Sequence, residues 1–212
     1  AMSAIDMALW DIKGKYENKP VFELLGGKKQ DYVIPYASLQ PIGHSFQEYK
    51  DSLVAWAIKA KELGFKAVKS EVTLNGPYAH SGLNENDERT TEVVAAVRNA
   101  LGPEIKLMID VQYRWHDAEA ALKTVKDWGE YDIYFLETPV WTDDIKSYAR
   151  MHDEAPMKIA AGEWLSTKYE FEDLIVNGKI DVAQPDIGRC GGLTEALKIA
   201  EFSQLHNRII VP

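Results

Sequence analysis

Three short apolar runs decide the fold, and each ends in an acidic residue: KLMID (residues 106–110), IYFLE (133–137) and IAAGE (159–163). Asp110, Glu137 and Glu163 lie 27 and 26 positions apart, about the length of one strand, one helix and two loops. Carboxylates at the C-terminal ends of successive parallel strands converge on one mouth of an α/β barrel. Oxygen ligands meeting there suit Mg²⁺, so the spacing predicts a magnesium site.

Strand and helix signals alternate along most of the chain. Continuous apolar runs predict parallel strands covered by helices over residues 33–39, 67–72, 106–111, 133–137, 159–163, 182–186 and 209–211. Spaced apolar positions predict helices over 46–63, 87–101, 118–128, 144–152, 169–176 and 193–206. Gly64 and Gly102 are helix C-cap candidates, and Thr142 or Asp143 is a candidate N-cap. The alternation predicts a parallel α/β architecture.

The strand count favours an unclosed barrel. A closed barrel has eight strands, whereas seven are predicted here and the last breaks off at Pro212. An open doubly wound sheet is the alternative, but it binds ligands at one switch point, and the sequence has no GxGxxG or GxxxxGK[ST] phosphate loop. We therefore predict a TIM-like (β/α) barrel over residues 31–212, incomplete in what looks like a fragment. Residues 3–13 predict an amphipathic helix that docks on neighbouring structure.

Composition favours a soluble enzyme. The chain has 212 residues, 46% of them apolar, enough for a sizeable core. A net charge of −9 argues against a nucleic-acid partner. No apolar run approaches the ~18 residues of a membrane span, and the N-terminus does not resemble a signal peptide. The single cysteine, Cys190, excludes an intramolecular disulfide framework, and we expect a cytoplasmic protein.

Further polar residues lie on or just after the predicted strands. Side chains alternate between the two faces of a strand. Lys69 and Glu71 are therefore expected on one face of their strand, and Asp110 and Gln112 on one face of theirs. A lysine near carboxylates can act as a base or as an electrostatic stabiliser, so Lys69 is a catalytic candidate; a structural pair with Glu71 is the alternative. Asp186 ends the run VAQPD before a glycine-rich turn and is a second catalytic candidate, or else a cap for that turn.

The remaining candidates are weaker. None of the histidines has metal-ligand spacing, and most are expected at the surface. His80 lies in a long polar loop, residues 75–86, and is a candidate substrate contact. Trp141 follows the ETP turn and is expected to border the mouth of the barrel, whereas the other tryptophans are expected in the core or at interfaces. Cys190 is expected to be a packed small residue rather than a nucleophile.

Seven motifs, in this order along the chain, resemble the mandelate racemase and muconate lactonising branch of the enolase superfamily. The motifs are SAIDMALWDIKGK (3–15), PVFELLGG (20–27), FKAVKSEV (65–72), IDVQ (109–112), LETP (136–139), AAGEW (160–164) and QPDIGRCGG (184–192). The resemblance implies an enolase-type barrel over residues 31–212, preceded by residues 1–30 as the end of a capping domain and its linker.

The resemblance also implies a chemistry. A substrate carboxylate binds Mg²⁺, a base removes the proton α to it, and the metal stabilises the enediolate that forms. Asp110, Glu137 and Glu163 match the metal ligands of the family, and Lys69 matches the lysine of the second strand. Asp186 matches the aspartate of a His–Asp dyad whose histidine is expected at or beyond Pro212.

One departure from the family pattern directs the functional prediction. Many members have Lys-x-Lys on the second strand, whereas this chain has Lys69-Ser70-Glu71. Racemisation by two bases is therefore less favoured than dehydration of an aldonic or other sugar acid, a small-molecule carboxylate whose hydroxyls Glu71 and Gln112 would contact. A racemase, epimerase or cycloisomerase on the same scaffold is the first alternative, and a non-catalytic relative is the second. Family members are commonly oligomeric, which leaves a homo-oligomer open.

Overall fold

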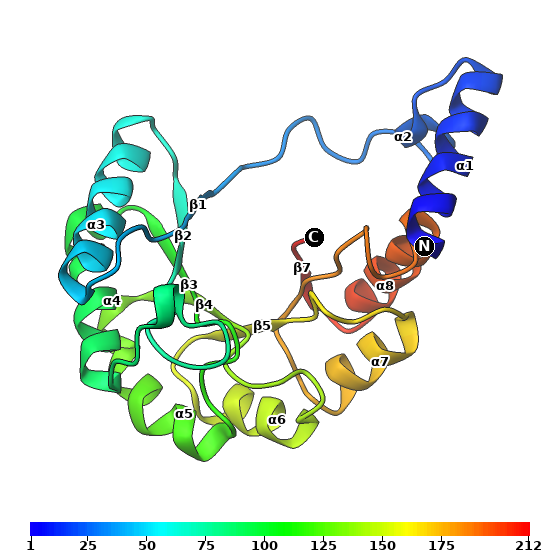
Figure 1. The fold of residues 1–212 in the computed structure, drawn as a ribbon. Helices are drawn as coiled ribbons and strands as arrows, with labels where there is room; N and C mark the ends of the chain where they lie inside the picture. The colour runs from blue at the N-terminus through cyan, green and yellow to red at the C-terminus, as the bar shows by residue number, and fades with distance from the viewer.

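A computed structural model describes residues 1–212 and contains one parallel sheet of seven strands. The strands follow one another in the sheet in chain order: β1 (Ala37–Leu39), β2 (Ala67–Glu71), β3 (Lys106–Asp110), β4 (Ile133–Glu137), β5 (Lys158–Ala161), β6 (Val182–Ala183) and β7 (Ile209–Ile210). A doubly wound sheet would reverse its strand order at a switch point, so this sequential order excludes that alternative. The curled sheet confirms the predicted incomplete barrel (Figure 1).

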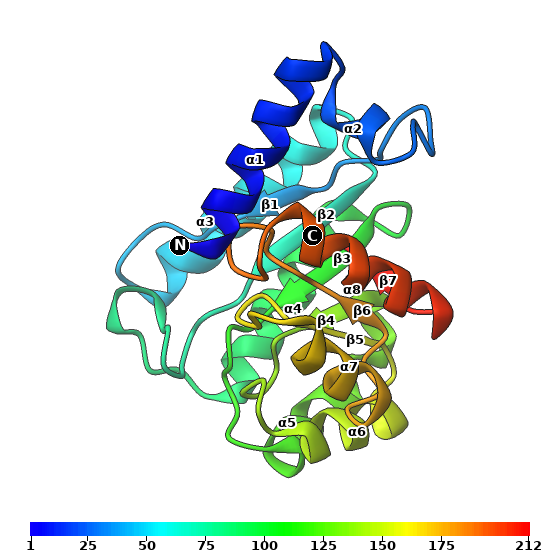
Figure 2. The same cartoon turned by 90° about the vertical axis from the view of Figure 1, so that its right-hand side faces the viewer.

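The convex side of the sheet is covered by α3 (Phe46–Glu62), α4 (Asp87–Leu101), α5 (Ala118–Val125), α6 (Ile145–Glu154), α7 (Lys168–Val176) and α8 (Leu193–Leu205) (Figures 1 and 2). Outside this layer, α1 (Met2–Glu17) packs against α8, and α2 (Val21–Leu24) packs against α1. Short 3₁₀ helices, η1 (His80–Gly82) and η2 (Lys126–Tyr131), precede α4 and β4. None of the helices is long and apolar enough to cross a membrane.

Side-chain caps explain where the helices begin. Ser45 and Glu48 form a capping box at the start of α3, and Asn86, Asp117, Asp144 and Thr167 each accept a backbone N–H bond at the starts of α4, α5, α6 and α7. The prediction of Thr142 or Asp143 as the cap of α6 is wrong, because Asp144 reaches the Ser147 N–H at 3.1 Å. Gly64 has a φ of 86° just after α3, as predicted for a C-cap glycine.

The two faces of the sheet differ in what covers them. In β3, Leu107 and Ile109 belong to the large core between sheet and helices, whereas Met108 belongs to a small cluster with Phe135, Ala160 and Val182. These four residues therefore line the concave side. Because side chains alternate between faces, Asp110 shares the concave side with Met108. The alternation of side chains along β3 thus places Asp110 in the interior of the barrel.

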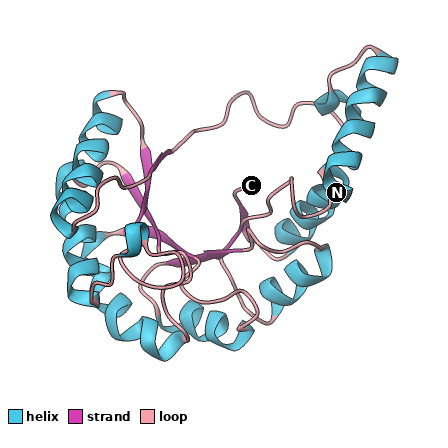
Figure 3. Cartoon of the chain, in the orientation of Figure 1, coloured by secondary structure: helices cyan, strands magenta, loops and turns pink.

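The sheet is open between its first and last strands (Figure 3). β1 pairs only with β2, and β7 pairs only with β6. β1 is shorter than the predicted strand over residues 33–39, because residues 33–36 have no strand partner. The segment from α2 to β1 runs across the open side (Figure 1).

α1 docks on the start of α8. The Ser3 hydroxyl accepts a bond from the Gly191 N–H at 3.1 Å, and the Trp10 indole N–H donates to the Thr194 hydroxyl at 2.9 Å. Asp6 accepts two further bonds from Thr194. The N-terminal helix is thereby joined to the turn that follows β6. The division into residues 1–30 and 31–212 stays a prediction.

Candidate active site

Three carboxylates lie side by side at the C-terminal ends of neighbouring strands. Glu71 is the register partner of Asp110, and Asp110 is the register partner of Glu137. Asp110 and Glu137 are almost fully buried, with exposed fractions of 6% and 3%. The structure thus places Asp110 and Glu137 at the predicted strand ends, and adds Glu71 to the same row.

Glu163 and Asp186 lie beyond their strands rather than at the tips. β5 ends at Ala161 because Gly162 turns the chain with a φ of 126°, and a Cβ there would overlap the Phe171 ring. β6 ends at Ala183, close to Pro185, whose missing N–H cannot continue the ladder. The predicted strands 159–163 and 182–186 were therefore too long at their C-terminal ends.

Lys69 is the cation of the site. Its ammonium donates to both oxygens of Glu137 at 2.8 Å and lies 3.9 Å from Asp110 Oδ2. Burial opposes the charge on Lys69, but the charges of Glu137 and Asp110 outweigh it and raise the lysine pKa. Lys69 is therefore a protonated partner of the two carboxylates in this arrangement.

Each buried carboxylate has further donors. Asp110 Oδ1 accepts bonds from the Thr138 hydroxyl and the Gln112 backbone N–H, each at 3.0 Å. Burial and the neighbouring Glu137 charge nevertheless raise the pKa of Asp110. Glu137 Oε2 also accepts a bond from the side-chain amide of Gln184 at 2.8 Å. Both buried carboxylates thus accept bonds from polar groups other than Lys69.

The three predicted metal ligands do not surround one point as they stand. No group of three or more His, Cys, Asp or Glu side chains is arranged to hold a metal ion. Glu163 instead accepts a bond from the Tyr113 hydroxyl at 2.9 Å, and burial and this carboxylate together raise the pKa of Tyr113. The ligand set Asp110, Glu137 and Glu163 therefore stays a prediction.

Asp186 lies in the turn before α8. Its Oδ1 accepts the Gly188 N–H at 2.7 Å, and its Oδ2 lies 3.7 Å from the Arg189 guanidinium. A pocket of about 240 Å³ is lined by Asp186, Arg189, Glu163 and Gln112, among others. The pocket brings two predicted catalytic-site acids together, and the catalytic role of Asp186 stays a prediction.

The period-two argument for Gln112 is wrong. β3 ends at Asp110, and both Gln112 and Tyr113 adopt left-handed backbone conformations, with φ of 43° and 61°. The chain turns there instead of continuing as a strand, and the Tyr113 N–H bonds to the Thr138 carbonyl at 2.6 Å. Gln112 still lines the 240 Å³ pocket, so its proposed substrate contact stays open on different grounds.

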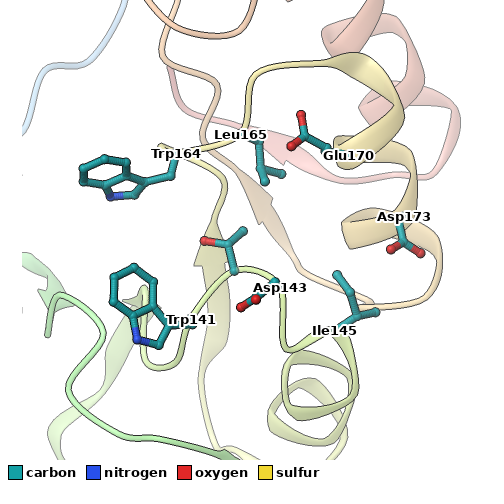
Figure 4. A pocket seen from close by; sticks show the side chains of 8 residues that line it. Trp141, Asp143, Ile145, Trp164, Leu165, Glu170 and Asp173 are labelled. Atoms are coloured by element: carbon teal, nitrogen blue, oxygen red, sulfur yellow. The ribbon is translucent and has the colours of Figure 1, made fainter.

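Aromatic side chains border the mouth. Trp141 is 45% exposed and stacks on Tyr113 with 4.6 Å between ring centroids, and Tyr78 stacks on Trp164 at 6.4 Å. Trp141 and Trp164 also line a neighbouring hollow of about 620 Å³ (Figure 4). The predicted position of Trp141 beside the mouth agrees with this geometry, whereas its contact with a substrate stays a prediction.

Glu71 and His80 have structural partners. Glu71 accepts a bond from the Thr73 hydroxyl at 3.3 Å, and burial raises its pKa. The His80 ring nitrogen Nε2 lies 3.0 Å from the Gly43 carbonyl, and the ring packs edge-on against Tyr49. His80 therefore joins its loop to the β1–α3 connection, and a substrate contact by either residue stays a prediction.

The sequence patterns did not predict two residues of the site, Gln184 and Tyr113. Gln184 could have been found, because period two from Val182 puts it on the concave face, two residues before Asp186. Tyr113 carried no such signal, because its approach to Glu163 depends on the left-handed turn after β3.

Family models match both ends of the chain. Residues 52–212 match the enolase C-terminal domain-like family, and residues 1–26 match the mandelate racemase/muconate lactonizing enzyme N-terminal domain. A D-gluconate dehydratase of Thermoproteus tenax is 37% identical over 207 residues, covering 96% of this chain and 40% of that protein. A D-galactarolactone cycloisomerase of Agrobacterium fabrum is 34% identical, covering 100% of this chain and 53% of that protein.

The crystal structure of the 3,6-anhydro-D-galactonate cycloisomerase from Zobellia galactanivorans is similar, with a TM-score of 0.86 and 38% identity. The match covers 100% of this chain and 55% of that one. The chain thus spans about half the length of the relatives it matches. The family models and the shared fold establish that this chain belongs to the mandelate racemase/muconate lactonising branch of the enolase superfamily.

Proposed function

We propose that the full-length protein is a Mg²⁺-dependent lyase that dehydrates a sugar acid, an aldonate or an aldarate. The observation that carries the proposal is the buried pair Asp110 and Glu137, in register at the C-terminal ends of their strands with Lys69 between them. The relative of Thermoproteus tenax, a D-gluconate dehydratase, supports the substrate class.

The donor set fits a divalent cation. Asp110 and Glu137 offer buried carboxylate oxygens, the ligand type that Mg²⁺ prefers. Gln184 Oε1 is also buried without a hydrogen-bond partner, which indicates that the site takes up a further group. Asp110, Glu137 and Glu163 would hold the ion. When bound, Mg²⁺ would polarise the substrate carboxylate as a Lewis acid.

The chain's own residues have distinct roles in the proposal. Lys69 is held as a cation beside the carboxylates and would stabilise negative charge on the substrate as the α-proton leaves. Asp186 would orient a histidine base that removes this proton. Glu71 and Gln112 would contact the substrate hydroxyls. A general acid would protonate the β-hydroxyl so that it leaves as water, and the enol that remains would tautomerise to the 2-keto product.

A cycloisomerase is the second candidate, because two of the similar proteins carry that name. Cycloisomerisation rearranges the substrate without loss of atoms, whereas dehydration releases one water. The mass of the product therefore separates dehydration from cycloisomerisation. A racemase or epimerase would instead exchange the α-proton and scramble the configuration at the α-carbon without loss of water.

The test is a screen of the full-length protein with Mg²⁺ against aldonic and aldaric acids. Semicarbazide detects a 2-keto product, and mass spectrometry reports whether the product has lost one water. We expect a 2-keto product lighter by one water, with activity abolished by Glu137→Gln. Glu201→Gln is the matched control, since Glu201 is exposed on α8.

The outcomes separate the candidates. Turnover of an acid with unchanged product mass would replace the dehydratase by a cycloisomerase or an epimerase. Full activity of Glu137→Gln would show that the buried carboxylate pair is not the reaction centre. No turnover of any acid, with Mg²⁺ bound, would argue for a non-catalytic relative or for carboxylate substrates outside the sugar acids.

A further inference from the structure

We infer that Gln184 is a positioning residue that fixes the carboxylate of Glu137 for metal binding. The inference rests on the proposed metal site. Glu137 comes from the end of β4, and its two polar partners reach it from opposite directions along the curled sheet: Lys69 from β2 and Gln184 from just after β6. Lys69 donates to both oxygens, and Gln184 donates to Oε2, each at 2.8 Å.

The backbone of Gln184 is itself fixed. Its N–H donates to the Ala161 carbonyl at 3.0 Å, a hydrogen bond that belongs to the last register pair of β5 and β6, Ala161 and Ala183. Pro185 follows, and the residue before a proline is restricted to extended conformations. The amide is therefore anchored to the sheet and not to a loose turn, so it can hold Glu137 in one orientation.

The orientation of the amide is also determined. The amide nitrogen Nε2 of Gln184 donates to Glu137 Oε2, so the amide carbonyl is turned away from that carboxylate. Oε1 is then left as an acceptor, and it is buried without a partner in a residue that is 7% exposed. Buried acceptors normally have donors, so this atom marks a place that a water or a substrate hydroxyl would fill beside the ion.

The proposal predicts a defect in metal capture rather than in folding. Hydrogen bonds to a metal-ligating carboxylate orient it, and their loss typically lowers metal affinity about 10–100-fold. Gln184→Met keeps the length and approximate volume of the side chain but cannot donate to Glu137. Lys69 alone would then hold the carboxylate, which would be free to turn about the remaining contact.

The test is a titration of the metal-free full-length protein with Mn²⁺, an EPR-active substitute for Mg²⁺. We expect Gln184→Met to bind Mn²⁺ about 10–100-fold more weakly than the wild type, with a changed spectrum of the bound ion. Gln204→Met is the matched control, because Gln204 is exposed on α8, and its affinity should equal that of the wild type. Thermal unfolding of the metal-free proteins establishes that each is folded.

The outcomes are decisive in each case. Wild-type affinity and spectrum in folded Gln184→Met would overturn the positioning role while leaving the proposed function intact. If Gln184→Met does not fold, Gln184→Asn decides, because its shorter amide cannot hold the 2.8 Å contact without movement. Unchanged Mn²⁺ affinity in that variant would likewise overturn the role. A wild type that binds no Mn²⁺ would remove the metal site and this inference together.

Discussion

The side chain of Asp6 occupies the space where a Cβ on Gly192 would lie. From there Asp6 accepts bonds from the Thr194 N–H at 3.0 Å and the Thr194 hydroxyl at 2.5 Å. The carboxylate thus sits at the N-terminus of α8, where backbone N–H groups and the helix dipole favour negative charge. The absence of a side chain at residue 192 is therefore what lets α1 reach the turn that carries Asp186.

Gly192→Ala is predicted to detach α1. Its methyl group would displace Asp6, and its φ of 89° is unfavourable for any residue but glycine. Hydrogen–deuterium exchange in the full-length protein should show faster exchange over Met2–Glu17. The control is Gly64→Ala, which has a similar φ of 86° but no atom within 4 Å of the added Cβ. Equal exchange over Met2–Glu17 in the two variants would show that the contact between Asp6 and residue 192 does not hold α1 in place.

Lys69→Met is predicted to destabilise the metal-free protein, since it leaves Asp110 and Glu137 buried without a cation. Removing one partner of a buried ion pair typically costs about 3–5 kcal/mol. Denaturant unfolding should show a loss of that size, which Mg²⁺ should partly reverse if the carboxylates bind it. Lys198→Met, which removes an exposed partner of Glu195, should change stability by less than about 1 kcal/mol. A loss that Mg²⁺ leaves unchanged would count against the metal site.

Much of this arrangement follows from local sequence patterns. Continuous apolar runs predicted all seven strands, and the acidic residues at strand ends predicted that Asp110 and Glu137 meet at one mouth of the barrel. The predicted strand ends were wrong where an uncommon backbone conformation ends the strand. Gly162 turns the chain before Glu163, and Tyr113 adopts a positive φ that its residue type does not reveal.

Contacts between residues on distant strands could not be predicted from the sequence either. Gln184 and Glu137 are 47 positions apart, and they meet because the sheet curls between β4 and β6. The curl is a property of the whole sheet, and no local pattern gives the distance between two strand ends. The sequence therefore located the carboxylates but not the amide that fixes one of them.

Asp87 is predicted to make stability depend on pH. Burial alone would raise its pKa, but bonds from Thr124 and Arg114 and the charge of Arg114 outweigh burial and lower it. A lowered pKa contributes stability above the unfolded-state value, about 3.9, and this contribution is lost as the pH falls through the folded-state value. The difference in unfolding free energy between wild type and Asp87→Asn should be constant above about pH 5 and shrink below about pH 4.

The control for this pH dependence is Asp127→Asn, since Asp127 is exposed on η2. Its unfolding free energy should track that of the wild type across the same range. A difference for Asp87→Asn that stays constant down to pH 3 would show that the bonds to Thr124 and Arg114 do not depend on the charge of Asp87.

Arg98 is predicted to stabilise the segments that precede β3 and β4. Its guanidinium donates to the carbonyls of Gly102 and Ile105, both at 2.8 Å, and to those of Tyr131 at 2.7 Å and Asp132 at 2.9 Å. These carbonyls belong to the segments that lead from α4 into β3 and from η2 into β4. One side chain on α4 thus hydrogen-bonds to the segments just before β3 and β4. These are the two strands that end in Asp110 and Glu137.

Arg98→Met should lower the free energy of unfolding by about 1–3 kcal/mol, because it leaves carbonyls without their donor. Arg98→Lys should recover little of this loss, since a single ammonium cannot reproduce the planar fork that spans four carbonyls. Arg150→Met is the matched control: Arg150 is 49% exposed and pairs only with Glu154, so a change below about 1 kcal/mol is expected. Wild-type stability in Arg98→Lys would show that charge at this position matters and that the fork geometry does not.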